Sequence, residues 1–253
     1  MVLPVVAAAL LGGMRSAVVA EWKGNVDMKG YDITATGLKP RYPREFDCSP
    51  LTSLYASWID VDGTRRNERH SGVDGGRLGD WILAPGPGTV RAVWKADWGW
   101  GSEGALLIEH TSSGLNMTDD IPIFYSEFDH LSLAEIEHFK VGDRIVRGQK
   151  LAHVFRPGGN DEYLPEVHWE VWAIEKEEEL SWSTNRAGGR YWISPSARLI
   201  DPLYMLAQNS APDSDGGVAV TPFVAGDDYR GFHGFTYILP CQAQGKNGHA
   251  GKG

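Results

Sequence analysis

The chain has 253 residues, of which 42% are hydrophobic, and its formal net charge is -9. This length suits one main domain with extensions or two small domains, and the hydrophobic fraction is enough to build a core. The acidic balance and the lack of any dense run of Lys and Arg exclude an ordinary nucleic-acid-binding protein. With 31 Gly and 14 Pro, the composition favours short strands joined by many turns over a helical bundle.

Residues 1–20 are expected to be a signal peptide. The stretch from Leu3 to Leu11 is apolar, and small residues precede Glu21 as in a cleavage site. Against this, no basic residue precedes the apolar stretch, and Arg15 interrupts the expected signal peptide late in its length. The run is too short for an ordinary membrane span. We therefore expect an exported protein of the periplasm or the extracellular cell envelope, with no transmembrane span in the mature chain. A membrane-tethered terminus and a misassigned start codon are the alternatives.

Cys48 and Cys241 are the two cysteines of the chain. An oxidising compartment would allow them to pair. Their positions in the sequence do not show that they are close in space, so a disulfide and two free thiols both remain open.

Residues 21–44 form an N-terminal extension, and the alternating segment 51–61 predicts a strand. Residues 70–174 are the part of the chain richest in structural signals, and a helical turn or two is expected over Leu133–Phe139. Runs of β-branched and aromatic residues bounded by turns predict further strands. These strands are Gly88–Trp94, Ala105–His110, Ile123–Phe128, Arg144–Val146, Lys150–Phe155 and Val167–Ile174.

Segment 175–190 is charged and then Gly-rich, which predicts a solvated loop. Residues 199–204 are apolar enough to close a domain that spans 45–206. Residues 207–253 are rich in Ala, Pro, Ser, Asp and Gly, and we expect a largely disordered C-terminal tail. Within it, the apolar island Phe232–Leu239 could still dock on the domain.

His70 and Asp74 form an H-x-x-x-D pair, and His168 lies in a predicted strand. Two imidazoles and one carboxylate are the ligand set of a catalytic zinc that keeps its fourth position open for water. Alone the pair is weak evidence, because many loops carry this spacing by chance. Side chains two apart on a strand share a face, so Glu166 and Glu170 would lie on the face of His168. Glu170 could then orient a ligand imidazole.

Seven motifs follow one another in an order that strengthens this hypothesis. They are His70-Ser71-Gly72-Val73-Asp74, Ala84-Pro85-Gly86-Pro87-Gly88-Thr89-Val90, Ile108-Glu109-His110, Phe128-Asp129-His130-Leu131-Ser132, Val141-Gly142-Asp143 with Val146-Arg147-Gly148-Gln149, Glu166-Val167-His168-Trp169-Glu170-Val171, and Asp201-Pro202-Leu203. In this order, residues 70–206 resemble the lysostaphin-type zinc peptidases, which cut peptide bonds in bacterial peptidoglycan. The set is far more specific than any one motif.

The resemblance implies a fold and a set of roles. The fold would be all-β and mainly antiparallel, a barrel-like sandwich with an open groove. His70, Asp74 and His168 would bind zinc (Zn2+), and His130 would be a catalytic imidazole beside the metal-bound water. The family has a second catalytic imidazole where this chain has Glu166.

Three interpretations of Glu166 compete. It could be the general base, with His130 as the donor that stabilises the oxyanion. It could instead bind zinc as a fourth ligand and make the site structural. In the third interpretation, the fold survives as a binding module with little or no catalysis.

The expected function is that of a zinc metalloendopeptidase acting on peptidoglycan cross-bridges or stem peptides. The alternative is a catalytically impaired member of the same fold that binds peptidoglycan or regulates another cell-wall hydrolase. A lipoyl-type carrier shares the look of two hairpins but needs a Lys at a hairpin tip, and neither Lys95 nor Lys140 has that context.

Other aromatic and histidine side chains have weaker claims. His110 is expected to be structural or to support the site, and the remaining histidines have no motif context. Trp98, Trp100 and Tyr163 could line a groove for a glycan or peptide, although packing in the core or at its rim is the more ordinary role of such residues.

Overall fold

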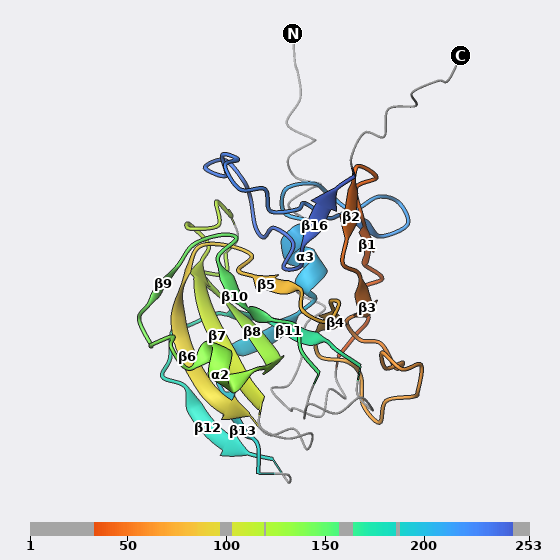
Figure 1. Ribbon diagram of the computed structural model, residues 1–253. Helices are drawn as coiled ribbons and strands as arrows, with labels where there is room; N and C mark the ends of the chain where they lie inside the picture. The colour runs from red at the N-terminus through yellow and green to blue at the C-terminus, as the bar shows by residue number, and fades with distance from the viewer. Residues whose placement is uncertain (1–32, 97–102, 119, 157–163, 186–187, 245–253) are drawn as a thin grey trace, which may run out of the picture.

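An open antiparallel sheet forms the centre of the molecule, seen here in a computed structural model (Figure 1). The structure describes residues 33–96, 103–118, 120–156, 164–185 and 188–244. Within these residues the sheet has eight strands, in the order β3-β4-β11-β8-β7-β6-β9 with β14 also paired to β11. The prediction of a mainly antiparallel all-β fold is confirmed, and over the described ranges the sheet does not close into a barrel.

The large sheet and the smaller elements have the following bounds. The strands are β1 Lys39–Arg41, β2 Phe46–Cys48, β3 Leu51–Ser53, β4 Val73–Gly75, β5 Trp81–Leu83, β6 Gly88–Ala96, β7 Glu103–Thr111, β8 Ile123–Leu131, β9 Arg144–Ile145, β10 Lys150–His153, β11 Val167–Ile174, β12 Ser181–Thr184, β13 Arg190–Ile193, β14 Ala197–Ile200, β15 Gly217–Ala219 and β16 Cys241–Ala243. The helices are α2 Leu133–Ile136 and α3 Pro202–Leu206.

The strands predicted between residues 88 and 174 all occur, from β6 to β11, and the predicted helical turn is α2. Segment 51–61 differs, because only Leu51–Ser53 is a strand. The chain then turns, with Ala56 in a left-handed conformation (φ 59°) and its N–H donating to the carbonyl of His70. This turn brings the loop of residues 54–69 back toward β4.

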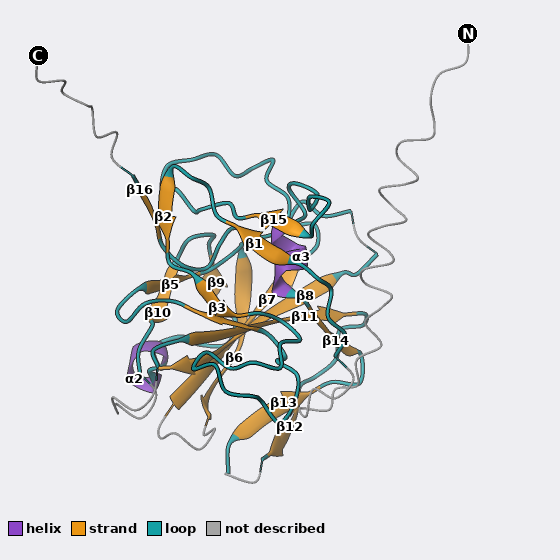
Figure 2. Ribbon diagram, turned by 90° about the vertical axis from the view of Figure 1, so that its right-hand side faces the viewer, coloured by secondary structure: helices purple, strands orange, loops and turns teal. Residues whose placement is uncertain are grey.

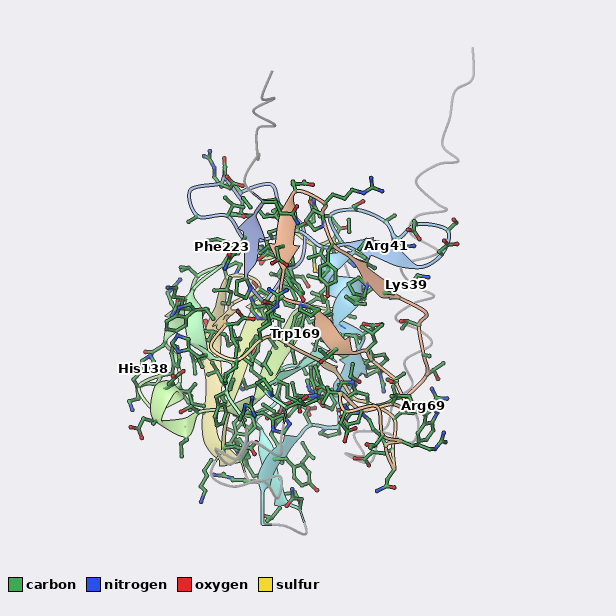
Figure 3. The ribbon with its side chains drawn as sticks, turned by 45° about the vertical axis from the view of Figure 1, so that its right-hand side comes forward. Lys39, Arg41, Arg69, His138, Trp169 and Phe223 are labelled. Atoms are coloured by element: carbon green, nitrogen blue, oxygen red, sulfur yellow. A yellow bond between two sulfur atoms is a disulfide. The ribbon has the colours of Figure 1, made fainter. Side chains whose placement is uncertain are left out.

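Strand β11 has two different faces, as its sequence predicts. Val167, Trp169 and Val171 are fully buried on one face. Figure 3 labels Trp169 at the middle of the molecule. His168 and Glu170 lie on the other face. The neighbours β8 and β4 run antiparallel to β11 on either side, so its polar residues are held between two strands.

Segment 175–190, expected to be a solvated loop, leads into a hairpin of β12 and β13. Trp182 packs edge-on against Trp94, and Trp192 packs against Tyr125 and Trp172. Aromatic burial therefore outweighs the charged and Gly-rich composition of the segment, of which residues 186–187 lie outside the described part.

The two ends of the described chain pack together as a terminal clasp, defined as residues 33–48 and 208–244. Strand β1 pairs with β15 in parallel and β2 with β16 in antiparallel register (Figure 2). Cys48 and Cys241 form a disulfide. Phe235 and Tyr237 are fully buried. Residues 207–244 are thus part of the fold rather than the largely disordered tail expected from composition, and the apolar island docks.

Figures 1 and 2 place the clasp strands and α3 at one end of the molecule and the β12–β13 hairpin at the other. No helix in the described residues is long and apolar enough to span a membrane. Residues 1–32, which include the expected signal peptide, lie outside the described part.

Candidate metal centre

Strand register gathers one row of polar side chains across the sheet. Asp74 of β4 pairs with His168 of β11, which pairs on its other side with Asp129 of β8. His70 lies four positions before Asp74, on the turn that enters β4. Gly72 allows this turn to approach β11, because a Cβ there would stand 2.3 Å from the carbonyl oxygen of Trp169. The sequence therefore brings the two halves of the predicted ligand set together through sheet pairing.

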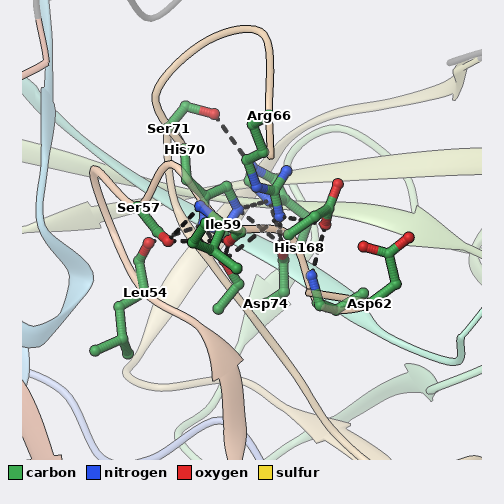
Figure 4. A network of polar contacts seen from close by, with 12 residues as sticks. Leu54, Ser57, Ile59, Asp62, Arg66, His70, Ser71, Asp74 and His168 are labelled. Carbon is green, nitrogen blue, oxygen red and sulfur yellow. Dashed lines mark hydrogen bonds and ion pairs between the residues drawn. The ribbon is translucent and has the colours of Figure 1, made fainter. Parts of the chain in front are cut away.

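His70, Asp74 and His168 converge on one point, and all three are buried (Figure 4). Asp74 Oδ1 lies 3.0 Å from His70 Nε2 and 2.8 Å from His168 Nδ1. The two ring nitrogens are 3.0 Å apart. A tetrahedral zinc ion with bonds of 2.0–2.1 Å needs ligand atoms ~3.3 Å apart, close to these spacings.

The outer nitrogens of both rings are held by acceptors. His70 Nδ1 lies 3.0 Å from the Leu54 carbonyl oxygen, and His168 Nε2 lies 3.0 Å from Glu170 Oε1. A carbonyl and a carboxylate only accept, so in the neutral form of each ring the outer nitrogen donates and the inner nitrogen keeps its lone pair. Three lone-pair atoms then face one another, an arrangement that a cation stabilises. The residues present fit zinc, and Glu170 makes the contact expected of a carboxylate that orients a ligand imidazole.

Arg66, which the sequence did not single out, contacts the second oxygen of Asp74. Its Nη2 lies 2.5 Å from Asp74 Oδ2 and 2.8 Å from Asp60 Oδ1. Burial alone would raise the pKa of Asp74, but the adjacent His70 and His168 hold that pKa well below its ordinary value. Arg66 leaves Oδ1 as the oxygen of Asp74 that faces the two rings.

Glu166 lies beside the three converging residues without joining them. In the described part of the chain, the group able to hold a metal consists of His70, Asp74 and His168 alone. Glu166 is buried, and its Oε2 has no hydrogen-bond partner among the described residues. Burial, and then the charge of Asp74, raise the pKa of Glu166 to about 7, against the opposing influence of His130 and His168. A carboxyl group with this pKa exchanges a proton readily near neutral pH.

His130 lies near the end of β8, with its ring centroid 6.2 Å from that of His168. Its Nδ1 is 2.6 Å from Oε2 of Glu103, a fully buried residue of β7. Burial works against a charge on this ring, but the hydrogen bond and charge of Glu103 outweigh it and raise the pKa of His130. Sequence reasoning missed Glu103, because no motif or spacing connects it to His130.

Two further buried carboxyl groups of β8 lie on the same face. Burial, the largest influence, raises the pKa of Asp129 to about 7. Burial and then the charge of Asp129 raise the pKa of Glu127 well above its ordinary value. The indole N–H groups of Trp172 and Trp192 both donate to Glu127 Oε2, at 3.1 and 2.8 Å. The signal available in the sequence was the alternation of acidic residues in Glu127-Phe128-Asp129.

His110 has the structural role expected of it. Its ring nitrogens lie 2.8 Å from the Pro87 carbonyl oxygen and 3.1 Å from Ser126 Oγ. Burial lowers its pKa to about 4, so this ring is neutral at ordinary pH. Three aromatic candidates for the groove wall, Trp98, Trp100 and Tyr163, lie outside the described residues.

No family model and no curated protein matches this chain. Among solved structures, the catalytic domain of a prophage-encoded M23 protein from Enterococcus faecalis is 24% identical, with 53% of this chain and 85% of that chain covered and a TM-score of 0.34. A zinc-containing peptidase from Vibrio cholerae is 27% identical over 49% of this chain and 33% of its own, at 0.33. The catalytic domain of lysostaphin from Staphylococcus simulans is 19% identical over 53% and 84%, at 0.32. One of these similar structures is lysostaphin, after which the family that the ordered motifs resemble is named.

Proposed function

We propose that this chain is a zinc-dependent metalloendopeptidase that hydrolyses peptide bonds in peptidoglycan cross-bridges or stem peptides. The observation that carries the proposal is the convergence of His70 Nε2, Asp74 Oδ1 and His168 Nδ1, with the outer ring nitrogens tied to acceptors. The substrate class comes from the ordered motifs over residues 70–206. The disulfide supports an exported protein, because disulfides persist in oxidising compartments.

Zinc would be held by His70, Asp74 and His168. When bound at such a site, zinc polarises the scissile carbonyl and lowers the pKa of its water to about 7. The protein contributes the orientation of the three ligands through Leu54, Glu170 and Arg66. It also excludes bulk water, since the ligands are buried.

Glu166 is the proposed general base. Its carboxylate accepts a proton from the attacking water and later gives it to the departing amine. The pKa of about 7 suits both transfers, because the group is then neither fully ionised nor fully protonated near neutral pH. The unpartnered Oε2 supports this role, since no described side chain already occupies that oxygen.

His130 is the proposed donor to the carbonyl oxygen. Nδ1 of the ring donates to Glu103, and the raised pKa of His130 favours the doubly protonated ring, in which Nε2 is also a donor. A donor placed where negative charge develops stabilises the transition state more than the substrate. In this proposal Glu166 is the general base and His130 is the hydrogen-bond donor, the two roles that the resemblance assigns to a pair of imidazoles.

One observation favours the alternative of a catalytically impaired, peptidoglycan-binding or hydrolase-regulating protein. Glu166 stands where the resemblance calls for an imidazole, and a carboxylate has no proton to donate when ionised. The interpretation of Glu166 as a fourth metal ligand has less support, because its oxygens lie outside the converging group.

Metal analysis and turnover on the same preparation separate these possibilities. We expect about one zinc per chain by mass spectrometry of the metal. We also expect release of new amino termini from peptidoglycan or oligoglycine, abolished by a chelator. Glu166→Ala should retain the metal and lower kcat by at least ~10²-fold, as expected for loss of a general base.

Glu166→His is the matched variant. If Glu166 is the working base, this substitution lowers kcat or leaves it unchanged. If the site is an impaired one, the imidazole raises turnover. Stoichiometric zinc in a wild-type protein that cuts no wall peptide would overturn the enzyme proposal in favour of the binding module.

A further inference from the structure

Glu103 and His130 form a buried pair that no motif of the sequence joins. Glu103 is fully buried at the start of β7, and His130 is 7% exposed near the end of β8. The two strands are antiparallel neighbours. Glu103 Oε2 and His130 Nδ1 lie 2.6 Å apart, a short contact of the kind favoured when a hydrogen bond is charge-assisted. A carboxylate buried this deeply is costly unless it has such a partner.

The backbone at His130 is distorted in a way that presents its ring to the metal-binding face. Gly104 pairs with Leu131 and Leu106 with Phe128, so two residues of β8 stand opposite one residue of β7. This is a β-bulge, and His130 within it has a φ of 57°, which side chains other than Gly rarely adopt.

The bulge has a direct consequence for the site. In a regular strand, His130 would point away from the face that carries its neighbour Asp129. Asp129 pairs with His168, so that face is the one with the metal ligands. The bulge re-aims His130, and its ring lies edge-on to the ring of His168. Strain of this kind persists only where the surroundings hold it.

Gly104 holds the bulge from the side of β7. A Cβ at Gly104 would stand 2.6 Å from Ile136 Cδ1 and 3.1 Å from Leu133 Cα. The missing side chain therefore allows α2, which begins three residues after His130, to pack on the start of β7. Glu103 is adjacent to this contact, so the carboxylate and the ring are fixed by the same packing.

We propose that Glu103 is a positioning residue for His130. Its carboxylate keeps a proton on Nδ1 of His130 and so holds the ring in the orientation that faces the reacting carbonyl. This inference rests on the proposed function, in which His130 is the donor. Glu103 does not touch substrate. It acts through the ring, as the carboxylate of a carboxylate–histidine pair does when it sets the orientation of an imidazole.

Three variants of the full-length zinc-loaded protein test the role. Glu103→Ala removes the acceptor, and we expect kcat to fall about 10²-fold while KM changes less than about threefold. Glu103→Gln keeps a carbonyl acceptor at the same reach, so it should retain kcat within about tenfold of wild type. Glu109→Ala is the matched control on β7, because Glu109 lies beside Arg91 rather than a histidine, and it should leave kcat unchanged.

Nuclear magnetic resonance of histidine labelled with ¹⁵N gives a readout that is independent of turnover. The Nδ1 proton of His130 should give a downfield signal in wild type and in Glu103→Gln, and that signal should be absent in Glu103→Ala, with zinc content equal in all three. Retention of the signal in Glu103→Ala, or a fall in kcat without its loss, would overturn the positioning role. If the wild type binds zinc and cuts nothing, the proposed function fails, while the signal still decides whether Glu103 positions the ring.

Discussion

The candidate metal centre and the terminal clasp both contain buried side chains, but these are of different chemical kinds. Around the metal centre, buried carboxyl groups stand within one sheet, and several have raised pKa values because burial penalises their charge. The clasp contains a disulfide, short strand pairs and fully buried apolar and aromatic side chains. One region concentrates ionisable groups, and the other combines a disulfide with buried apolar area.

The difference indicates that the candidate metal centre serves metal binding and turnover, whereas the clasp serves the stability of the fold. Burying carboxyl groups costs free energy that their partners only partly return. Tying residues 33–48 to residues 208–244 restricts the unfolded chain across most of its length. Changes at the metal centre should therefore alter metal binding and turnover more than stability, and changes in the clasp should do the reverse.

The largest effect is expected from His168→Ala. This variant removes one of the three converging ligand atoms and leaves only those of His70 and Asp74. Zinc should fall from about one per chain to a trace, and turnover should fall to background. Circular dichroism should show that the β fold remains. Full zinc retention in this variant would refute the proposed ligand set.

Loss of the disulfide is the next largest change. We expect Cys48→Ser combined with Cys241→Ser to lower the free energy of unfolding by about 4–5 kcal/mol, since the cross-linked residues are 193 positions apart. Urea denaturation of both proteins measures this. The zinc content of the folded double variant should equal that of wild type. A variant as stable as wild type, or one that has lost its metal while folded, would contradict the division between the two regions.

The sequence was sufficient for the middle of the sheet but did not predict strands β4 and β14. It also named three residues, His70, Asp74 and His168, whose possible ligand atoms lie close together in the structure. The strands from β6 to β11 follow from alternation and turn residues, and sheet pairing brings His70 and Asp74 to His168. The clasp was harder, because its elements are three residues long and gain stability only from partners far away in sequence. A segment rich in Gly, Pro and Asp is predicted to be disordered when the sequence does not reveal the distant strands with which it pairs.

Glu103 and the orientation of His130 were beyond sequence reasoning for a different reason. A regular alternation would place His130 on the wrong face, and only the bulge with its left-handed residue corrects this. Bulges arise from the fit between two strands, so one strand's sequence does not reveal them. Arg66 lies in a polar loop with no repeating pattern, and its contact with Asp74 depends on how that loop folds back.

Asp201 offers a test of buried charge outside the metal centre. It accepts hydrogen bonds from the Thr36 hydroxyl and, at 2.9 Å, from the Leu203 N–H that begins α3. Burial raises its pKa to about 6. A raised pKa means that its contribution to stability is fully present below about pH 3.9 and is lost as pH rises through about 6.

Asp201→Asn removes this titration and keeps a side chain that caps helices well. The variant should gain stability relative to wild type as pH rises from 4 to 7, by at most about 3 kcal/mol. Asp213→Asn is the control with opposite sign, because backbone N–H groups lower the pKa of Asp213 and its contribution is lost as pH falls. Parallel pH profiles of wild type and Asp201→Asn in urea denaturation would contradict the prediction.

The smallest effect compares two glutamates that face each other on adjacent strands. Glu170 of β11 pairs with Glu127 of β8. Glu170 accepts from His168 Nε2, and that contact contributes to holding its pKa below the ordinary value despite burial. Burial, and then the charges of Asp129 and Glu170, raise the pKa of Glu127 well above its ordinary value, which favours its protonated form. An amide is close in shape to a protonated carboxyl group but lacks the charge of a carboxylate.

Glu170→Gln should therefore weaken zinc binding by about 10–100-fold, because the ring of His168 loses its charged acceptor. Glu127→Gln should change zinc affinity by less than about threefold, since the raised pKa of Glu127 already favours an uncharged group and the oxygen that accepts from Trp192 is kept. Competition with a chromogenic chelator at pH 7 measures both. Equal losses in the two variants would show that the acidic row acts on the metal as a whole, and that the contact between Glu170 and His168 has no special part in it.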